Sequence, residues 1–214
     1  MKKNLIIPCL LAIIIPLSGC ATKGYNRAEN TSASLQHAAA RVDTSVRQVD
    51  LVLASLSNLV NQAGADLKPQ FGVFSSEIRK LESLSREINS KAQKIQKQGA
   101  AYFKTWDEEL AKIQNEELRN SSAQRKTEVM AQFDKVRASY EVTQNALAQF
   151  LAELEDIRRA MSVDLTPRGI SAIKTSVATA QTDGAIVRDS LSKLQADFRE
   201  LGATLSAAAP PPAG

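Results

Sequence analysis

The sequence predicts an all-α protein, an elongated antiparallel helical bundle or coiled coil of about four long helices. Apolar residues recur at the alternating four- and three-residue steps of a heptad through most of the 214 residues, which is the pattern of helices that pack side by side. Aromatic residues make up only 5% of the chain, and its 9 glycines and 7 prolines are sparse, as is typical of long helices. No stretch of useful length alternates apolar and polar residues as a strand does.

Residues 1–19 are predicted to be a signal peptide that is removed. Lys2 and Lys3 precede an apolar segment, Leu5 to Leu17, and small residues follow it, which is the three-part layout of a secretory signal. The apolar segment is shorter than the roughly 20 residues that a membrane-spanning helix needs.

The segment ends in Leu17-Ser18-Gly19-Cys20, which resembles the lipobox of bacterial lipoproteins. The resemblance implies cleavage between Gly19 and Cys20 and acylation of Cys20. Two or more acyl chains, at about 0.8 kcal/mol per buried methylene, would form a firm anchor. By resemblance to lipoproteins of enteric-type bacteria, Ala21 in place of Asp after the cysteine implies the outer membrane. The alternative is an ordinary signal peptide with an unrelated cysteine. Cys9 leaves with the signal peptide, so no disulfide is expected.

The mature chain is expected to comprise a lipidated tether (20–27), a bundle domain (28–206) and a disordered Ala/Pro-rich tail (207–214). If extended, residues 21–27 reach at most about 24 Å, so the bundle lies close to its membrane. The first heptad seam, the line of apolar positions along one helix face, runs from Leu35 to Ala63. Gly64 is expected to end this helix, since glycine is common just past a helix end.

The second helix is predicted to run from Leu67 to Ile113, with a seam that blurs after Trp106. The segment NEELRNSSAQRK, residues 115–126, would place charged side chains in the seam, so we expect a polar turn or the exposed tip of a hairpin. A second helix that continues straight into the third is the alternative. The third seam runs from Val129 to Met161.

Thr166 and Pro167 are predicted to be the N-cap and the first residue of a fourth helix, with Asp164 near the positive end of its dipole. Its seam runs from Ile170 to Leu205. Short breaks favour antiparallel neighbours in an up-down-up-down bundle, with helices about 60 Å long. The alternatives are a three-helix core with a detached first helix, and a long hairpin that oligomerises.

The sequence shows no pattern that favours an enzyme, a cofactor or a metal site. The only histidine, His37, falls on the outer face of the first helix and lacks the Glu-x-x-His spacing of di-iron bundles. Acidic pairs such as Glu108-Glu109 point in different directions on a helix, so we expect solvated faces there. Phosphate-loop and serine-nucleophile motifs are absent. Nucleic-acid binding is not expected, because the 27 basic residues form no stripe with interleaved aromatics.

Gly99 and Gly184 stand at seam positions, where glycine costs about 1 kcal/mol relative to alanine. We expect them to leave room for aromatic side chains such as Tyr102, Trp106 or Tyr140. A ligand pocket beside them is the functional alternative.

A candidate partner-binding site is the tip of a hairpin between the second and third helices, if that hairpin points away from the lipid. The tip carries polar residues that could contact a partner: Glu116, Arg119, Ser122, Arg125 and Lys126. The alternative is that these residues form only the soluble end of a hairpin.

Residues 102–125, YFKTWDEELAKIQNEELRNSSAQR, and less distinctly residues 150–174 resemble a bacterial family known mainly as a domain of unknown function. The family comprises small secreted or lipid-anchored helical proteins. The resemblance covers roughly the second half of the chain, and it implies an all-helical exported protein without naming a substrate or a catalytic residue. It rests on Trp106, Glu109-Leu110, Ile113, Leu118-Arg119, Ser122 and Asp164-Leu165.

These features predict a non-enzymatic lipoprotein of the outer membrane that faces the periplasm. It is expected to act as a structural or adaptor rod, with an envelope protein, peptidoglycan or a second copy of itself as partner. The alternative is a carrier or binding module for a lipid or another hydrophobic ligand. The narrow seams, which contain Ala, Ser, Thr and Gly, favour the rod, because a carrier needs a wider apolar interior.

Overall fold

The computed structural model describes residues 21–62 and 66–207, with side chains placed from residue 28 to residue 206 within that range. The described part contains no strand, and four of its five helices are long, so the all-α prediction is confirmed. Cys20, the predicted signal peptide and the tail after residue 207 lie outside the described residues. The helices are α1 (Ala21–Asn61), α2 (Lys68–Leu110), α3 (Glu116–Val163), α4 (Pro167–Ala172) and α5 (Lys174–Ala207).

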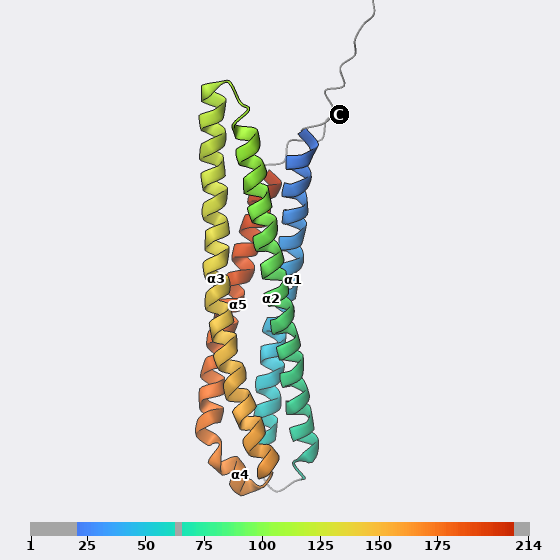
Figure 1. Ribbon diagram of the computed structural model, residues 1–214. Helices are drawn as coiled ribbons and strands as arrows, with labels where there is room; N and C mark the ends of the chain where they lie inside the picture. Colours follow the sequence, from blue (N-terminus) through green and yellow to red (C-terminus); the bar gives the residue numbers. More distant parts are fainter. Residues whose placement is uncertain (1–20, 63–65, 208–214) are drawn as a thin grey trace, which may run out of the picture.

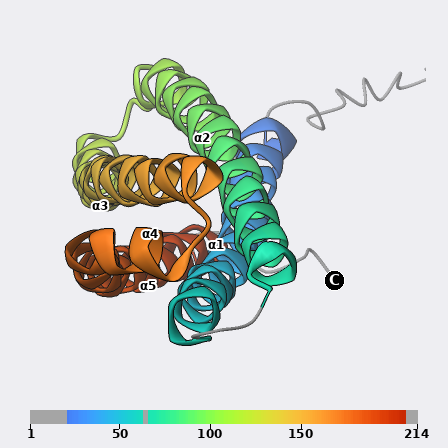
Figure 2. The same cartoon turned by 90° about the horizontal axis from the view of Figure 1, so that it is seen from below.

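The four long helices pack as an antiparallel bundle (Figure 1). α1 lies against α2 and α5, and α3 also lies against α2 and α5. Seen along the bundle, α2 crosses α1 at an angle while α3 and α5 run side by side (Figure 2). Because α1 packs on two helices, the alternative of a detached first helix is wrong. A turn at residues 111–115 separates α2 from α3, so the second helix does not continue straight into the third. With 48 residues in α3, the rod is about 70 Å long at 1.5 Å per residue.

Residues 21–27, which were predicted to belong to the tether, form the first two turns of α1. A helical segment of this length spans about 10 Å rather than the 24 Å of an extended chain. The first turn of the bundle therefore follows Cys20 directly in the chain.

The predicted start of the fourth helix is confirmed, but that helix is divided in two. Thr166 is the N-cap of α4, and its hydroxyl accepts a hydrogen bond from the Gly169 amide at 3.2 Å. The same hydroxyl donates to the Asp164 carboxylate at 2.6 Å. Ile173 then leaves the helical conformation, with φ −92° and ψ 3°, so α5 begins as a separate helix at Lys174.

The seam residues of all four long helices meet in one core, as the heptad spacing predicts. The largest fully buried side chains include Phe74, Leu81, Phe150, Leu154, Leu191 and Phe198. Among the described residues, α1 buries more polar side chains than any other helix: Thr31, Ser32, Ser45, Gln48 and Ser55. Two of these bind neighbouring helices: Ser32 donates to the Gly202 carbonyl at 3.0 Å, and Gln48 donates to the Glu77 carbonyl at 3.1 Å. The core is therefore closed, and partly hydrogen-bonded where α1 meets its neighbours.

Gly99 and Gly184 do leave room for larger side chains, but not for the ones expected. A Cβ atom on Gly99 would lie 2.5 Å from Cε1 of Phe133, and a Cβ atom on Gly184 would lie 2.7 Å from Cδ1 of Leu53. Both neighbours come from an adjacent helix, which the spacing within one helix cannot indicate. Tyr102, Trp106 and Tyr140 are not the side chains that fill these spaces.

We expect Gly99→Ala to lower the free energy of unfolding by about 1 kcal/mol, because overpacking against Phe133 outweighs the better helix propensity of alanine. Gly72 in the same helix is the matched control, since a Cβ atom there meets nothing within 4 Å. Gly72→Ala should raise stability by up to about 1 kcal/mol. Urea unfolding followed by circular dichroism measures both. An equal gain in the two variants would show that the Phe133 ring moves aside freely.

Candidate functional site

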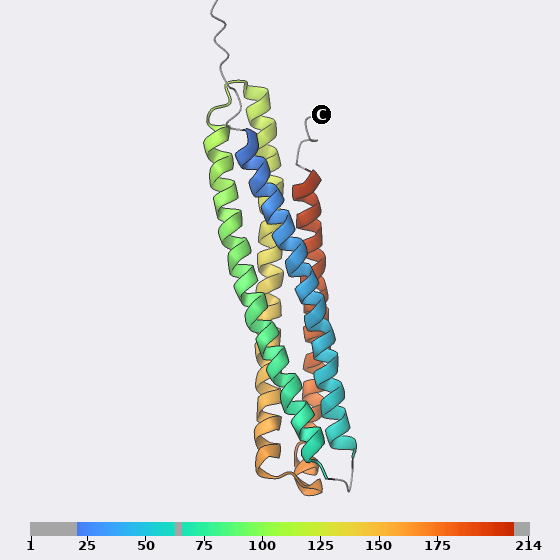
Figure 3. The same ribbon diagram turned by 90° about the vertical axis from the view of Figure 1, so that its right-hand side faces the viewer.

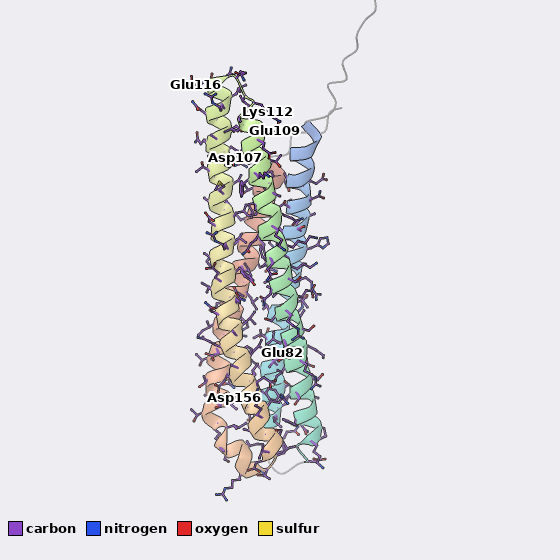
Figure 4. All side chains as sticks on the ribbon, in the orientation of Figure 1. Glu82, Asp107, Glu109, Lys112, Glu116 and Asp156 are labelled. Carbon is purple, nitrogen blue, oxygen red and sulfur yellow. The ribbon has the colours of Figure 1, made fainter. Side chains whose placement is uncertain are left out.

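The tip of the α2–α3 hairpin, where residues 111–115 join the two helices, is the candidate site (Figure 4). α3 begins at Glu116 because Asn115 is an N-cap: its backbone is extended, and its side chain accepts a hydrogen bond from the Leu118 amide at 3.0 Å. Two acidic residues then occupy the first turn, where the helix dipole favours negative charge. Of the two forms predicted for residues 115–126, the polar turn is wrong, because all but the first of them belong to α3, whereas a hairpin tip does lie at this point of the chain.

Three of the five predicted site residues contact neighbouring helices: two join the arms of the hairpin, and one joins the hairpin to α5. Ser122 accepts a hydrogen bond from the Trp106 indole N–H at 2.9 Å. Arg125 donates to a carbonyl near the end of α5 at 3.1 Å. Lys126 forms an ion pair with Asp107 of α2. These polar residues are half-buried at positions that continue the heptad spacing beyond Trp106. Their burial is possible because neighbouring helices supply hydrogen-bond and ion-pair partners.

The other two predicted residues, Glu116 and Arg119, are exposed. Leu118 lies between them in the sequence and is 62% exposed, although it is a large apolar side chain. These three side chains are among those that the tip presents to another molecule. That the tip binds a protein partner stays a prediction.

An aromatic cluster lies just behind the tip and joins α2 to α3. The Tyr102 and Trp106 rings are 5.4 Å apart, and the Phe103 and Phe133 rings are 5.1 Å apart, both pairs edge to face. Burial raises the pKa of Tyr102, against a smaller opposing effect of the Arg125 charge. Edge-to-face pairs of this kind each stabilise a structure by about 0.5–1.5 kcal/mol beyond the area that they bury. The hairpin is therefore a stiff extension of the bundle.

Trp106→Phe and Ser122→Ala should each lower stability by about 1 kcal/mol, since each removes the same indole-to-hydroxyl hydrogen bond. The double variant should lose clearly less than the sum of the two single losses, because the bond can be lost only once. Urea unfolding of the four proteins measures this coupling. Strict additivity would mean that the bond contributes nothing in solution.

An open hollow of about 310 Å³ lies between α2 and α3 beside the aromatic cluster. Phe103 and Phe133 form its apolar wall, with Gly99 and Ala100 on α2 leaving the space. Arg137, which pairs with Asp134 at 3.0 Å, lines one side. Its volume is at the lower end of the range found for small-ligand sites, so the hollow is the feature that supports the carrier alternative.

A second polar cluster, absent from the sequence analysis, lies between α3 and α5. Asp197 is 3% exposed and accepts hydrogen bonds from Ser139 at 2.5 Å and Lys193 at 2.9 Å. Lys135 lies 3.3 Å from the same carboxylate. Burial alone would raise the pKa of Asp197, but the hydrogen bonds from Ser139, Lys193 and Lys135 outweigh it and hold this pKa below its ordinary value. The Ser139 hydroxyl donates to the Asp197 carboxylate, and both lysines pair with the same carboxylate, so the cluster joins α3 to α5.

The comparison with known families decides where this bundle belongs. A family described as a protein of unknown function, DUF2959, matches residues 18–200. The chain belongs to this family. The resemblance in the sequence analysis covered only the second half, whereas the match extends over α1 as well. No curated protein and no solved structure matches the chain.

For this DUF2959 member, the described residues include no group of three or more His, Cys, Asp or Glu side chains placed to hold a metal ion. His37 is exposed, as predicted. Among the helices between residues 21 and 207, none is both long and apolar enough to cross a bilayer.

The tip lies at the same end of this DUF2959 rod as the first turn of α1 and the last turn of α5 (Figures 1 and 3). The candidate partner site depended on a hairpin that points away from a lipid on Cys20, and the start of α1 at the same end as the tip does not fit that condition. In an up-down-up-down bundle, the start of the first helix and the turn between the second and third helices share one end. An anchor at Cys20 would place the tip on the membrane side.

Proposed function

We propose that this DUF2959 protein is a non-enzymatic lipoprotein, anchored through Cys20 in the outer membrane and facing the periplasm, that acts as a structural or adaptor rod of the cell envelope. The observation that carries the proposal is the lipobox-like Leu17-Ser18-Gly19-Cys20 placed directly before a long, closed bundle. The family match begins at residue 18, so Cys20 lies within it.

The closed core supports a rod rather than a carrier. The seam side chains are buried against one another, and the ion pairs on the helices are mostly exposed pairs three or four residues apart, such as Arg159 with Asp156. Exposed pairs of this kind contribute little stability, and they keep a helical surface solvated. A rod of this form offers long, rigid sides to a partner.

Mass spectrometry of the N-terminal tryptic peptide, Cys20 to Lys23, tests the anchor. The proposal expects acyl chains on Cys20 and recovery of the protein with outer membranes, while Cys20→Ala is expected to leave that fraction. An unmodified peptide would overturn the lipoprotein proposal.

Photo-crosslinking of the lipidated protein in its host tests the adaptor role. Arg119 at the tip and Val163 at the opposite end, which is 89% exposed, are suitable positions for the crosslinking residue. One dominant envelope protein or peptidoglycan adduct supports an adaptor, and adducts with itself alone support an oligomeric structural rod. Adducts with neither would contradict both forms of the rod.

The second candidate, a carrier for a hydrophobic ligand, is favoured only by the hollow beside Phe103 and Phe133. Native mass spectrometry of the Cys20→Ala protein purified from its host would reveal a bound lipid. Ala100→Leu, which fills the hollow from α2, is the matched control and should abolish such binding. A ligand that survives this substitution would have to lie elsewhere.

A further inference from the structure

The distance between the proposed anchor and the hairpin tip is short along the rod axis. Ala21, the first residue of α1, follows Cys20 in the chain, and consecutive Cα atoms are about 3.8 Å apart. Figures 1 and 3 both show the tip of the α2–α3 hairpin reaching beyond the first turn of α1. No spacer separates the anchor position from the bundle, so the bundle cannot stand clear of the membrane.

Interhelical hydrogen bonds give the heights of the helix ends independently of the views. Ser32 of α1 bonds to Gly202 of α5, and Arg125 of α3 bonds to the carbonyl of Thr204, two residues further on. From these levels α1 extends eleven residues to its start, α3 nine residues to its start and α5 three residues to its end. At 1.5 Å per residue, the starts of α1 and α3 both lie more than 10 Å beyond the Thr204 carbonyl along the rod axis, and the end of α5 lies about 4 Å beyond it. The tip and the start of α1 therefore form the end of the rod together.

The side chains at the tip suit a lipid headgroup region. Leu118 is 62% exposed, while Leu110 at the end of α2 and Ile113 in the following turn are half-buried. The chain around them, residues 108–119, carries four acidic residues against two basic ones, Lys112 and Arg119, and Lys112 pairs with Glu109 at 2.8 Å. An exposed apolar side chain can enter the boundary between headgroups and acyl chains, and the excess of acidic residues favours a zwitterionic surface over an anionic one.

We propose that the tip of the α2–α3 hairpin is a second membrane contact, which rests on the phospholipid surface that holds the acylated Cys20. This inference rests on the proposed function. Two contacts, the lipid anchor below α1 and Leu118 on the neighbouring hairpin, hold the rod upright on the bilayer.

A fluorescent label at single cysteines in the lipidated protein, reconstituted in zwitterionic phosphatidylethanolamine–phosphatidylcholine vesicles, tests the contact. Cys9 leaves with the signal peptide and Cys20 is acylated, so an introduced cysteine is the only free thiol. Leu118→Cys reports on the tip, Val142→Cys on the middle of α3 and Val163→Cys on the far end. The latter two side chains are 61% and 89% exposed, so all three sites are open to a label.

The expected result is a several-fold loss of quenching by an aqueous quencher at Leu118 on membrane binding, with no change at Val142 and Val163. Equal quenching at all three sites in acylated, vesicle-bound protein would overturn this inference and leave the lipoprotein proposal standing. Protection at Val142 as well would mean that the rod lies flat, which also overturns it. Unmodified Cys20 would overturn both proposals.

A tip variant separates lipid contact from protein contact. Leu118→Glu should restore quenching of a label at Arg119→Cys in vesicles, while the acyl anchor still holds the protein on them. Protection of the tip that appears only in native membranes, together with one protein crosslinked at Arg119, would assign the tip to a protein partner and overturn the lipid contact.

Discussion

Gly169→Ala is expected to lower the free energy of unfolding by about 2–3 kcal/mol, the larger of the glycine effects in this protein. A Cβ atom at this position would lie 2.0 Å from the carbonyl oxygen of Asp164. That oxygen belongs to the backbone, so it cannot swing away as the end of a side chain can. The clash is relieved only if α4 moves away from Asp164. This movement also lengthens the hydrogen bond between the Gly169 amide and the Thr166 hydroxyl that caps α4.

Thermal and urea unfolding measure this effect, and Gly72→Ala again provides the control. The fold should remain helical, because α4 has only 6 residues and the long helices do not depend on it for their own hydrogen bonds. A Gly169→Ala protein as stable as the parent would show that the turn before α4 adjusts without loss.

Asp197→Ala is expected to lower stability by about 2 kcal/mol at neutral pH, because it leaves the buried Ser139 hydroxyl without its acceptor and removes the charge partner of two lysines. Lys135 and Lys193 are half-exposed or more, so they regain water and the loss stays moderate. Glu200→Ala is the matched control, since Glu200 pairs with the same Lys135 at the exposed edge of the cluster. It should leave the unfolding midpoint nearly unchanged.

The pH dependence of the Asp197→Ala effect follows from the lowered pKa of this carboxyl. A group whose pKa is lower in the folded state stabilises that state above its unfolded pKa, about 4 for Asp, and loses this effect as the pH falls through the folded value. The stability difference between parent and variant should therefore be constant from pH 5 upward and shrink below about pH 4. A difference that persists undiminished at low pH would mean that Asp197 acts through packing alone.

The helices could be predicted because local signals determine them. Heptad spacing locates the core faces, and Thr166 followed by Pro167 marks the start of α4 as the structure has it. The packing of the tip residues could not be predicted in the same way, since Ser122 and Lys126 are polar residues in seam positions. Only Trp106 and Asp107, which lie across the hairpin, make those positions favourable.

Asp197 shows a similar limit. An isolated acid next to apolar seam residues is expected on a solvated face, and the partners that allow its burial, Ser139 and Lys135, come from α3. The end of the rod at which the tip lies could have been predicted from the sequence, however, because an antiparallel four-helix topology places the tip at the end where α1 begins.

The position of Cys20 at the start of α1 determines how the rod would carry mechanical load. A partner that pulls on the far end, near α4, would draw α2, α3 and α5 away from the membrane while the lipid retains α1. The force would then run along α1 and shear its whole length against α2 and α5, so that the interhelical contacts resist together. A pull across the bundle would instead separate the contacts one after another, and forced unfolding follows the rate of that separation. An anchor on Cys20, as proposed, would thus load the bundle along its axis, the direction in which its interhelical contacts resist together.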